Sequence, residues 1–309
     1  MADLCNSPKI TDGGKTSQSA GRMRDVWIAA MPATFVFLWS SGFIGAKYGL
    51  PYAEPFTFLG IRFVTVAALM LLICFITRAP WPKDRIAFLH VAVCGLLVQA
   101  TYLGGVFTSI HHGLPTGISA LIPGLQPILT AFFARYVLNE ILAPRQWLGV
   151  VLGFLGVVLV VANKLSLSGD LIASILLAGV SLIGITAGTL YQKKYGGEMD
   201  LRSGSVIQFG ASAVVMWAFA FTFESREIQW TGEFIFAMFW LVFVMSIGAI
   251  SLLMLLIRKG AVAKVASLFY LVPPVTAIMG FLMFGETLGF TELAGFAVTV
   301  VGVALVTRG

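Results

Sequence analysis

The sequence predicts an all-α membrane protein of ten transmembrane helices, arranged as two inverted repeats of five helices, with both termini in the cytoplasm. Three observations support this fold class. The 309 residues are 58% hydrophobic and 11% charged, with a mean hydropathy of +0.93, whereas a soluble domain carries roughly 25% charge. The apolar residues fall in ten runs of about 20, the length of a helix that crosses a bilayer. Residue types of the first half also recur 146 positions later, as Pro127 and Pro273 illustrate.

Taken in order, the chain begins with residues 1–24, whose Ser, Gly, Lys, Asp, Asn and Thr content predicts a disordered cytoplasmic tail. A cleavable signal peptide is not expected, because the first apolar run is long enough to span and no small-residue cleavage pattern follows it. We expect the first repeat at 25–164 and the second at 165–309. The ten predicted helices lie near 27–47, 55–77, 87–109, 116–138, 143–163, 170–192, 203–223, 234–257, 261–284 and 288–307.

The repeat is clearest in two stretches that begin at Ala120 and Ala266. Each has an apolar run with a central proline, a short polar break with a glutamate, and a second apolar run with glycines. Because each half has an odd number of helices, the second half must cross the membrane in the opposite sense. Such inverted repeats are characteristic of secondary transporters. The matching pairs include Lys47 with Lys193, Pro127 with Pro273, Thr130 with Thr276, Glu140 with Glu286, Gly149 with Gly295 and Gly156 with Gly302.

The distribution of basic residues predicts the orientation. With a cytoplasmic N-terminus, sixteen of the 20 Lys and Arg residues fall in the tail, the inner loops or the C-terminus. The opposite loops hold only Lys164 and Arg226, and Lys47 and Arg62 fall within or at the ends of helices. This positive-inside bias accounts for the net charge of +6. A nucleic-acid partner is therefore not expected.

Four segments carry a resemblance to a known family: LWSSGFIGAK, PFTFLGIRFVTVAALML, NEILAPRQWLGVVLGFLGVVLV and GETLGFTELAGFAVTVVGVALV. Over about residues 26–307 the sequence resembles the EamA branch of the drug/metabolite transporter superfamily. The resemblance implies a ten-helix carrier of the inner (plasma) membrane that moves metabolites, often outward, with amino-acid exporters prominent. We therefore expect a secondary transporter of small organic metabolites, with amino acids first among the substrates. Nucleotide sugars or drugs are the alternative substrates.

Ionisable and polar residues within the predicted helices are the candidates for substrate binding. Arg62 lies about two turns into the second helix, where a charge costs roughly 2.5–3.5 kcal/mol on insertion scales. Its guanidinium can bind a carboxylate through a fork of donors or snorkel to the interface, and Lys47 has the same alternatives. Polar groups can instead join packed helices. The candidate residues for a cavity at the midplane are Trp39, Lys47, Arg62, Gln99, Tyr102, Gln126, Tyr191, Gln208 and Tyr270.

Prolines and glutamates suggest how such a carrier works. Pro127 and Pro273 fall near the middles of equivalent helices, where a kink predicts a gating element. Glu140 and Glu286 each precede a helix, and we expect each to cap that helix. No Asp or Glu falls in the middle of a predicted helix, so transport is expected to be facilitated or driven by the membrane potential. Coupling through the loop glutamates, Lys47 or a histidine stays open.

Other classes of protein find little support in the sequence. No GxxxxGK[ST] motif is present, which disfavours ATP-driven transport by this chain alone. A membrane-embedded lipid-modifying enzyme is the alternative from another class, and it would need a catalytic dyad or metal cluster that the spacing does not provide. The three cysteines form no CxxC pair. We expect no metal, no cofactor, and as partners only a small-molecule substrate, the lipid bilayer and a second copy of the chain, docked through the glycine-rich fifth or tenth helix.

Overall fold

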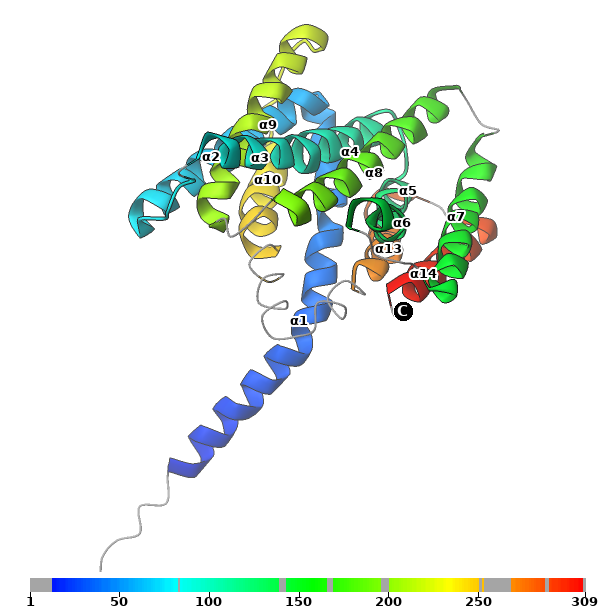
Figure 1. Ribbon diagram of the computed structural model, residues 1–309, viewed down its shortest axis with the longest axis horizontal. Helices are drawn as coiled ribbons and strands as arrows, with labels where there is room; N and C mark the ends of the chain where they lie inside the picture. The colour runs from blue at the N-terminus through cyan, green and yellow to red at the C-terminus, as the bar shows by residue number, and fades with distance from the viewer. Residues whose placement is uncertain are drawn as a thin grey trace, which may run out of the picture.

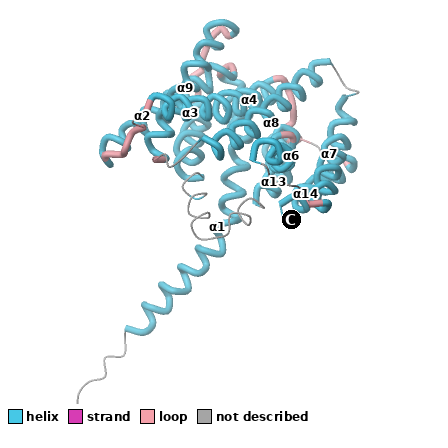
Figure 2. Tube along the Cα trace, viewed as in Figure 1, coloured by secondary structure: helices cyan, strands magenta, loops and turns pink. Residues whose placement is uncertain are grey.

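The structure is a computed structural model, which describes residues 13–82, 84–138, 143–165, 169–195, 200–249, 252, 268–286 and 289–307. Figures 1 and 2 show an assembly of helices, and an isolated bridge between Ala53 and Ile228 is the β contact found in the described residues. The elements are α1 (Gly13–Gly49), η1 (Leu50–Tyr52), α2 (Pro55–Thr77), α3 (Arg85–Gly95), η2 (Leu96–Thr101), α4 (Tyr102–His111), α5 (Thr116–Leu121), η3 (Pro123–Leu125), α6 (Gln126–Leu138), α7 (Pro144–Leu165), α8 (Gly169–Tyr195), α9 (Leu201–Phe223), α10 (Gly232–Phe239), η4 (Trp240–Ala249), η5 (Phe269–Leu271), α13 (Val272–Phe284) and α14 (Phe290–Thr307).

Five helices in the described ranges are long and apolar enough to cross a bilayer. Three shorter apolar helices accompany them, at Pro144–Val160, Val272–Phe284 and Phe290–Leu305. Helix α1 begins at Gly13, so the expected boundary between tail and first repeat at residue 25 lies inside a helix, and residues 1–12 lie outside the described part. Figure 1 shows the first half of α1 projecting away from the other helices. The five long spans are Pro55–Thr77, Arg85–His111, Leu171–Tyr195, Leu201–Phe223 and Gly232–Ala249.

The elements repeat with the same separation as the sequence. Helix α2 begins at Pro55 and α9 at Leu201, 146 residues later, and their last residues, Thr77 and Phe223, are separated by the same number. The same offset relates η3 to η5, α6 to α13, and the starts of α7 and α14. Each half also contains a π-helical segment in its third span, η2 in the first and η4 in the second. The duplication is therefore structural, down to local irregularities.

Equivalent helices of the two halves run antiparallel, as an inverted repeat requires. At the start of α2, the Glu224 carboxylate, which follows α9, accepts hydrogen bonds from the Phe56 and Thr57 backbone nitrogens at 2.7 Å each. At the opposite ends, the Ser203 hydroxyl of α9 donates to the Pro80 carbonyl at 2.7 Å. These contacts define two faces of the molecule. We call them the Glu286 face, where α1, α9 and α13 end and α2 begins, and the Asp200 face, where α2 and α8 end and α9 begins.

Glycines bring α7 and α14 into close contact, and Figure 1 shows the two helices side by side at one edge of the molecule. A Cβ atom on Gly302 would meet the backbone nitrogen of Gly153 and lie 2.7 Å from the Gly149 carbonyl oxygen. A Cβ on Gly156 would lie 2.7 Å from the Gly295 carbonyl oxygen. The small residues of these helices are thus used for packing within one chain. They give no support to the homodimer expected from the sequence.

An aromatic core fills the space between α2, α4 and α10 near the Glu286 face. Phe58, Phe107 and Phe234 are each at most 1% exposed, and the Phe58 ring lies 5.4 Å from the Phe107 ring and 5.3 Å from the Phe234 ring. Burial of such rings supplies large apolar area in tilted and edge-to-face arrangements. Phe58 precedes Arg62 by about one turn of α2, so this core lies between Arg62 and the Glu286 face.

Candidate substrate cavity

Two adjacent chambers, which share part of their wall, form a cavity between the two repeats. Five residues, Trp39, Phe43, Val98, Tyr102 and Ile185, line both chambers. The Arg62 chamber has a volume of about 150 Å³ and is otherwise lined by Gly42, Arg62, Gln99, Leu103, Val106, Phe107, Phe209, Leu241, Met245 and Ser246. The Gln126 chamber has a volume of about 280 Å³ and is otherwise lined by Ala120, Pro123, Gly124, Gln126, Pro127, Thr189, Gln192, Phe269, Val272 and Pro273.

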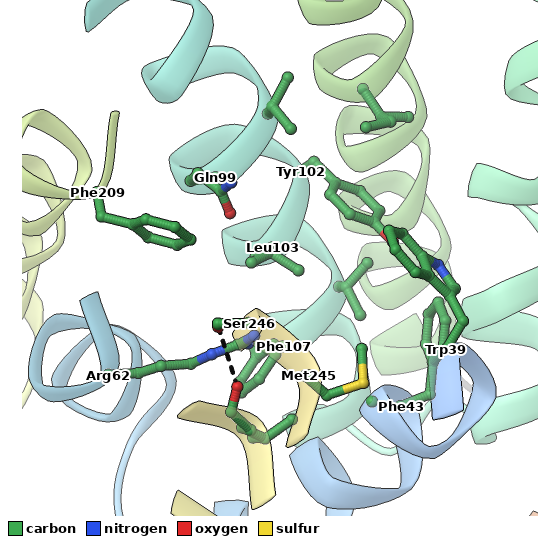
Figure 3. Close-up of a pocket in the computed structure, with 15 residues that line it drawn as sticks. Trp39, Phe43, Arg62, Gln99, Tyr102, Leu103, Phe107, Phe209, Met245 and Ser246 are labelled. Atoms are coloured by element: carbon green, nitrogen blue, oxygen red, sulfur yellow. Dashed lines mark hydrogen bonds between the residues drawn. The ribbon is translucent and has the colours of Figure 1, made fainter. Parts of the chain in front are cut away.

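Arg62 is the one formal charge among the described residues that line either chamber. Figure 3 shows its side chain reaching from α2 toward Ser246 of η4, below Gln99. The residue is 6% exposed, and its Nε atom is buried without a hydrogen-bond partner in the described part of the chain. Removing an ion from water costs several kcal/mol unless a partner compensates. The chamber therefore presents a desolvated cation whose fork of donors fits a carboxylate.

The two π-helical segments place polar groups around this cation. In η2 the Thr101 hydroxyl donates to the Leu96 carbonyl at 3.0 Å, and in η4 the Ser246 hydroxyl donates to the Leu241 carbonyl at 3.1 Å. Both bonds span five residues, which is the spacing of a π turn, and such turns often occur at functional sites. Gln99 of η2 and Ser246 of η4 both line the Arg62 chamber. The widened turns thus contribute neutral polar groups from the corresponding π-helical segments of both repeats.

Aromatic side chains form the junction between the chambers. The Trp39 ring packs against Phe35 of its own helix at 5.5 Å and edge-on against Phe269 of the second repeat at 5.1 Å. Phe43 follows Trp39 by one turn, and Figure 3 shows both on α1, facing Tyr102 and Met245. This junction is held from both halves of the chain and offers apolar surface beside the charge.

The Gln126 chamber is lined mostly by apolar residues, with a few neutral polar side chains and no formal charge in the described part of its wall. The Gln126 side-chain amide donates to the Thr189 hydroxyl of α8 at 2.8 Å, which in turn donates to the Ile185 carbonyl at 2.7 Å. Pro127 and Pro273 line this chamber, and each follows a 3₁₀ turn, η3 and η5 respectively. The equivalent prolines therefore follow equivalent 3₁₀ turns and line one chamber. Gln192, near the end of α8, is exposed and extends the chamber toward the Asp200 face.

Comparison with known proteins settles which family this architecture represents. The family model described as "EamA-like transporter family" matches twice, at residues 26–162 and 172–308. The chain belongs to this family. It is a transporter and a multi-pass protein of the inner (plasma) membrane, in agreement with the apolar helices and the cavity between the repeats.

Several curated proteins are similar to this EamA transporter along most of its length. "Uncharacterized transporter YvbV" of Bacillus subtilis is 28% identical over 288 residues, which cover 90% of each chain. "Uncharacterized inner membrane transporter YedA" of Escherichia coli is 27% identical, with 88% of each chain covered. A "Probable amino-acid metabolite efflux pump" of Salmonella typhimurium is 27% identical over 86% of this chain and 90% of its own. A crystal structure with 16% identity matches 90% of this chain and 96% of its own with a TM-score of 0.64, which shows a shared fold.

The structure brings five of the nine expected binding residues of the EamA transporter together around the cavity: Trp39, Arg62, Gln99, Tyr102 and Gln126. Lys47 lies instead at the Glu286 face in an ion pair with Glu286. Tyr191 lies against His90, whose Nδ1 atom is 2.7 Å from the tyrosine hydroxyl. Gln208 packs its backbone on Gly95, where an added Cβ would lie 2.5 Å from the Gln208 Cα. The Tyr270 side chain lies outside the described residues.

The expected role of the two glutamates needs correction for Glu286. Its carboxylate does not cap α14, which follows it, but accepts hydrogen bonds at the start of α5, from the Thr116 nitrogen at 3.0 Å and the Thr116 hydroxyl at 2.8 Å. Gly285, with a φ of +65°, turns the chain back over the end of α13 and directs Glu286 away from α14. Glu140 lies outside the described residues.

Sequence reasoning missed several residues that line the cavity: Phe107, Thr189, Gln192, Phe209, Met245 and Ser246. Phe107, Phe209 and Met245 have the residue types of ordinary core packing, so no signal separates them from the rest of their helices. Ser246 carried a usable signal, because it is the one polar residue in the run Trp240–Ala249. In the part of the chain that the structure describes, no group of His, Cys, Asp and Glu is arranged to hold a metal ion.

Proposed function

We propose that this protein is a secondary transporter of small carboxylated metabolites, with amino acids as the first substrate class, and that it moves them outward by alternating access. In this proposal ten helices span the membrane and both termini are cytoplasmic. The basic residues of the inner loops then put the Asp200 face in the cytoplasm and the Glu286 face outside. The described spans and the antiparallel packing of α2 on α9 are compatible with this topology.

The observation that carries the substrate class is the guanidinium of Arg62 in the cavity wall, whose buried Nε has no hydrogen-bond partner among the described residues. A carboxylate bound there forms charge-assisted hydrogen bonds, which are roughly twice as strong as neutral ones. The rings of Trp39 and Phe107 beside it favour a solute with an apolar or aromatic body. The similar Salmonella typhimurium protein, named as an amino-acid metabolite efflux pump, supports the same class and direction.

The prolines of the Gln126 chamber are proposed as bending points of the transport cycle. Pro127 and Pro273 lack the donor of a regular helix and both line the chamber. In an inverted repeat, the two halves exchange conformations when the carrier switches from one open side to the other. The bends at the two prolines would then exchange their geometries. Conversion of either proline to alanine should therefore alter turnover more than apparent affinity. An unchanged turnover in Pro127→Ala and Pro273→Ala would leave the prolines a packing role only.

The ionisable residues in the described cavity wall bear on what drives transport. The described lining of the two chambers contains no Asp or Glu, so the usual carboxylate proton relay is not part of the proposal. Transport is driven by the substrate gradient or by the membrane potential acting on the net charge that moves.

The test is uptake of a panel of labelled amino acids into proteoliposomes, with no gradient, with a proton gradient and with an imposed potential. We expect saturable uptake of amino acids with apolar or aromatic side chains that responds to the solute gradient or the potential. Absence of flux for every amino acid in a folded preparation would reject this substrate class, and the panel would then be extended to nucleotide sugars and drugs.

A further inference from the structure

The Glu286 carboxylate joins the two repeats at one face of the molecule. Glu286 follows α13 of the second repeat, and it forms an ion pair with Lys47 in the last turn of α1 of the first repeat. The same carboxylate accepts hydrogen bonds from Thr116 at the start of α5, also of the first repeat. The Lys47 ammonium additionally lies 4.8 Å from the centroid of the Phe284 ring. Three helices from both halves thus meet at one charged group.

Two glycines, one in α13 and one directly after it, allow the Glu286 carboxylate to reach Lys47 and Thr116. Gly285 has a φ of +65°, a conformation that strains residues with a side chain, and the Glu286 nitrogen donates back to the Gly280 carbonyl at 3.3 Å. A Cβ atom on Gly280 would lie only 2.5 Å from both a Glu286 carboxylate oxygen and the Thr116 hydroxyl. Two glycines are therefore needed for the carboxylate to reach its partners. We call Lys47, Thr116, Gly280, Gly285 and Glu286 the Glu286 latch.

The latch ties together helices that line the substrate cavity. Lys47 follows Phe43 by one turn of α1, Thr116 precedes Ala120 by one turn of α5, and Glu286 follows the helix that contains Pro273. The latch lies at the Glu286 face, whereas the Gln126 chamber extends toward Gln192 and the Asp200 face. The side chains of Glu286 and Lys47 are 9% and 32% exposed, so the pair is partly shielded from solvent.

We propose that Glu286 is a gating residue of the transport cycle, an inference that rests on the proposed alternating-access function. In the conformation seen here its carboxylate holds α1, α5 and α13 together and closes the cavity at the Glu286 face. To open that face, α13 moves away from α1 and α5, and Glu286 releases Lys47 and Thr116. In the sequence, Lys193 and Glu140 stand at the repeat-related positions of Lys47 and Glu286. Glu140 lies outside the described residues, and the proposal depends on Glu286 alone.

The first test measures access to the cavity and needs no substrate. Ser246→Cys, in a chain whose Cys5, Cys74 and Cys94 are replaced by serine, places a thiol in the Arg62 chamber. A membrane-impermeant maleimide is added to the outside of intact cells and, in parallel, to the outside of inverted vesicles, so that each face of the membrane is probed separately. Glu286→Gln and Lys47→Met should each raise the labelling rate from the Glu286 face by about tenfold, the factor that corresponds to about 1.4 kcal/mol.

Glu54→Gln is the matched control for this test. Glu54 lies on the same face and accepts hydrogen bonds from the Ser225 nitrogen and hydroxyl at 2.7 and 2.8 Å, but it belongs to the contact between α2 and α9. Its replacement should leave labelling of the cavity thiol unchanged. Gly280→Ala, which changes no charge but displaces the carboxylate, should raise labelling as Glu286→Gln does. Equal labelling in wild type, Glu286→Gln and Gly280→Ala would overturn the proposal, as would an equal increase in Glu54→Gln.

The second test asks whether the latch must open in every cycle. Lys47→Cys with Glu286→Cys, in the same cysteine-free background without the Ser246→Cys reporter, allows the two positions to be joined by a short bis-maleimide. Joining them should stop flux in proteoliposomes, whereas a monofunctional maleimide on the same variant should not. Continued flux after complete cross-linking contradicts the gating role. If the latch variants change labelling but no amino acid is transported, the substrate proposal is rejected and the gating role of Glu286 is retained. If the cross-linked carrier transports amino acids at the full rate, the gating role is rejected and the substrate proposal is retained.

Discussion

Lys47 and Arg62 are both basic residues in the helices of the first repeat, but their surroundings are opposite. Lys47 is one-third exposed and paired with Glu286, which lies 239 residues away in the sequence. Arg62 is 6% exposed, and its Nε atom has no partner in the described residues. A cation that already has its counter-ion serves the protein's own structure. A desolvated cation without a counter-ion, in the wall of a cavity, is available to a ligand.

The largest expected effect concerns Arg62. Arg62→Gln should lower the transport efficiency for a carboxylated solute by about 100-fold, because two charge-assisted hydrogen bonds are lost. Arg62→Lys should recover part of it, since a lysine keeps the charge but not the planar fork. Initial flux in proteoliposomes measures both. Arg226→Gln is the matched control, because Arg226 donates to the carbonyls of Ala220, Phe221 and Glu224 outside the cavity, and it should retain wild-type flux.

Removing the charge of Lys47 and removing the charge of Arg62 should change the stability of the fold in opposite directions. Lys47→Met leaves Glu286 without its counter-ion and should destabilise the fold, with a coupling of about 1–2 kcal/mol in the cycle with Glu286→Gln. Arg62→Met removes a buried charge that the described residues do not compensate, and it should stabilise the fold while transport is lost. Melting temperatures in detergent check both signs. A loss of stability in Arg62→Met would mean that Arg62 is a structural residue after all.

A smaller effect is expected where the two halves pack through glycine. Gly302→Ala should lower the melting temperature, because its Cβ would meet the Gly153 backbone, which cannot move aside as a side chain can. Gly179→Ala is the matched control, since a Cβ at Gly179 of α8 meets nothing within 4 Å. The control should be neutral or slightly stabilising, because alanine favours a helix by about 1 kcal/mol over glycine. Equal melting temperatures for the two variants would show that α7 and α14 separate without cost.

The smallest effect concerns pH and the Asp200 face. Hydrogen bonds from the Arg202 side chain and backbone lower the pKa of Asp200 from its ordinary 3.8 to about 2. Because the folded-state pKa is the lower one, ionised Asp200 stabilises the fold above pH 4, and this contribution is lost as the pH falls toward 2. Asp200→Asn should therefore lower the melting temperature at pH 6 and make it less sensitive to acid. Asp84→Asn is the control, because Asp84 precedes α3 without a side-chain cap bond, and it should leave the melting temperature at pH 6 unchanged.

The sequence predicted a duplicated, helical membrane protein because both the repeat and the apolar runs can be recognised from the residue types alone. The separation of 146 that relates Pro127 to Pro273 also relates the ends of α2 and α9. Arg62, Gln99 and Gln126 were expected in a cavity because polar residues in apolar runs need a reason. The sequence could not predict that Lys47 pairs with Glu286, since this contact depends on how the two repeats pack and on the turn at Gly285. It also could not show that Phe107, which packs on Phe58 in the core, lines the cavity as well.

The most direct test of the central claim is a competition measurement with an amino acid and the amide in which its carboxylate is replaced by a carboxamide. Labelled phenylalanine flux is measured in proteoliposomes while unlabelled phenylalanine or phenylalaninamide competes, in wild type and in Arg62→Gln. If Arg62 binds the substrate carboxylate, wild type should prefer the acid over the amide by about 100-fold, and the variant should show little preference. Equal inhibition by acid and amide in the wild-type carrier, or a preference for the acid that persists in Arg62→Gln, would contradict the account.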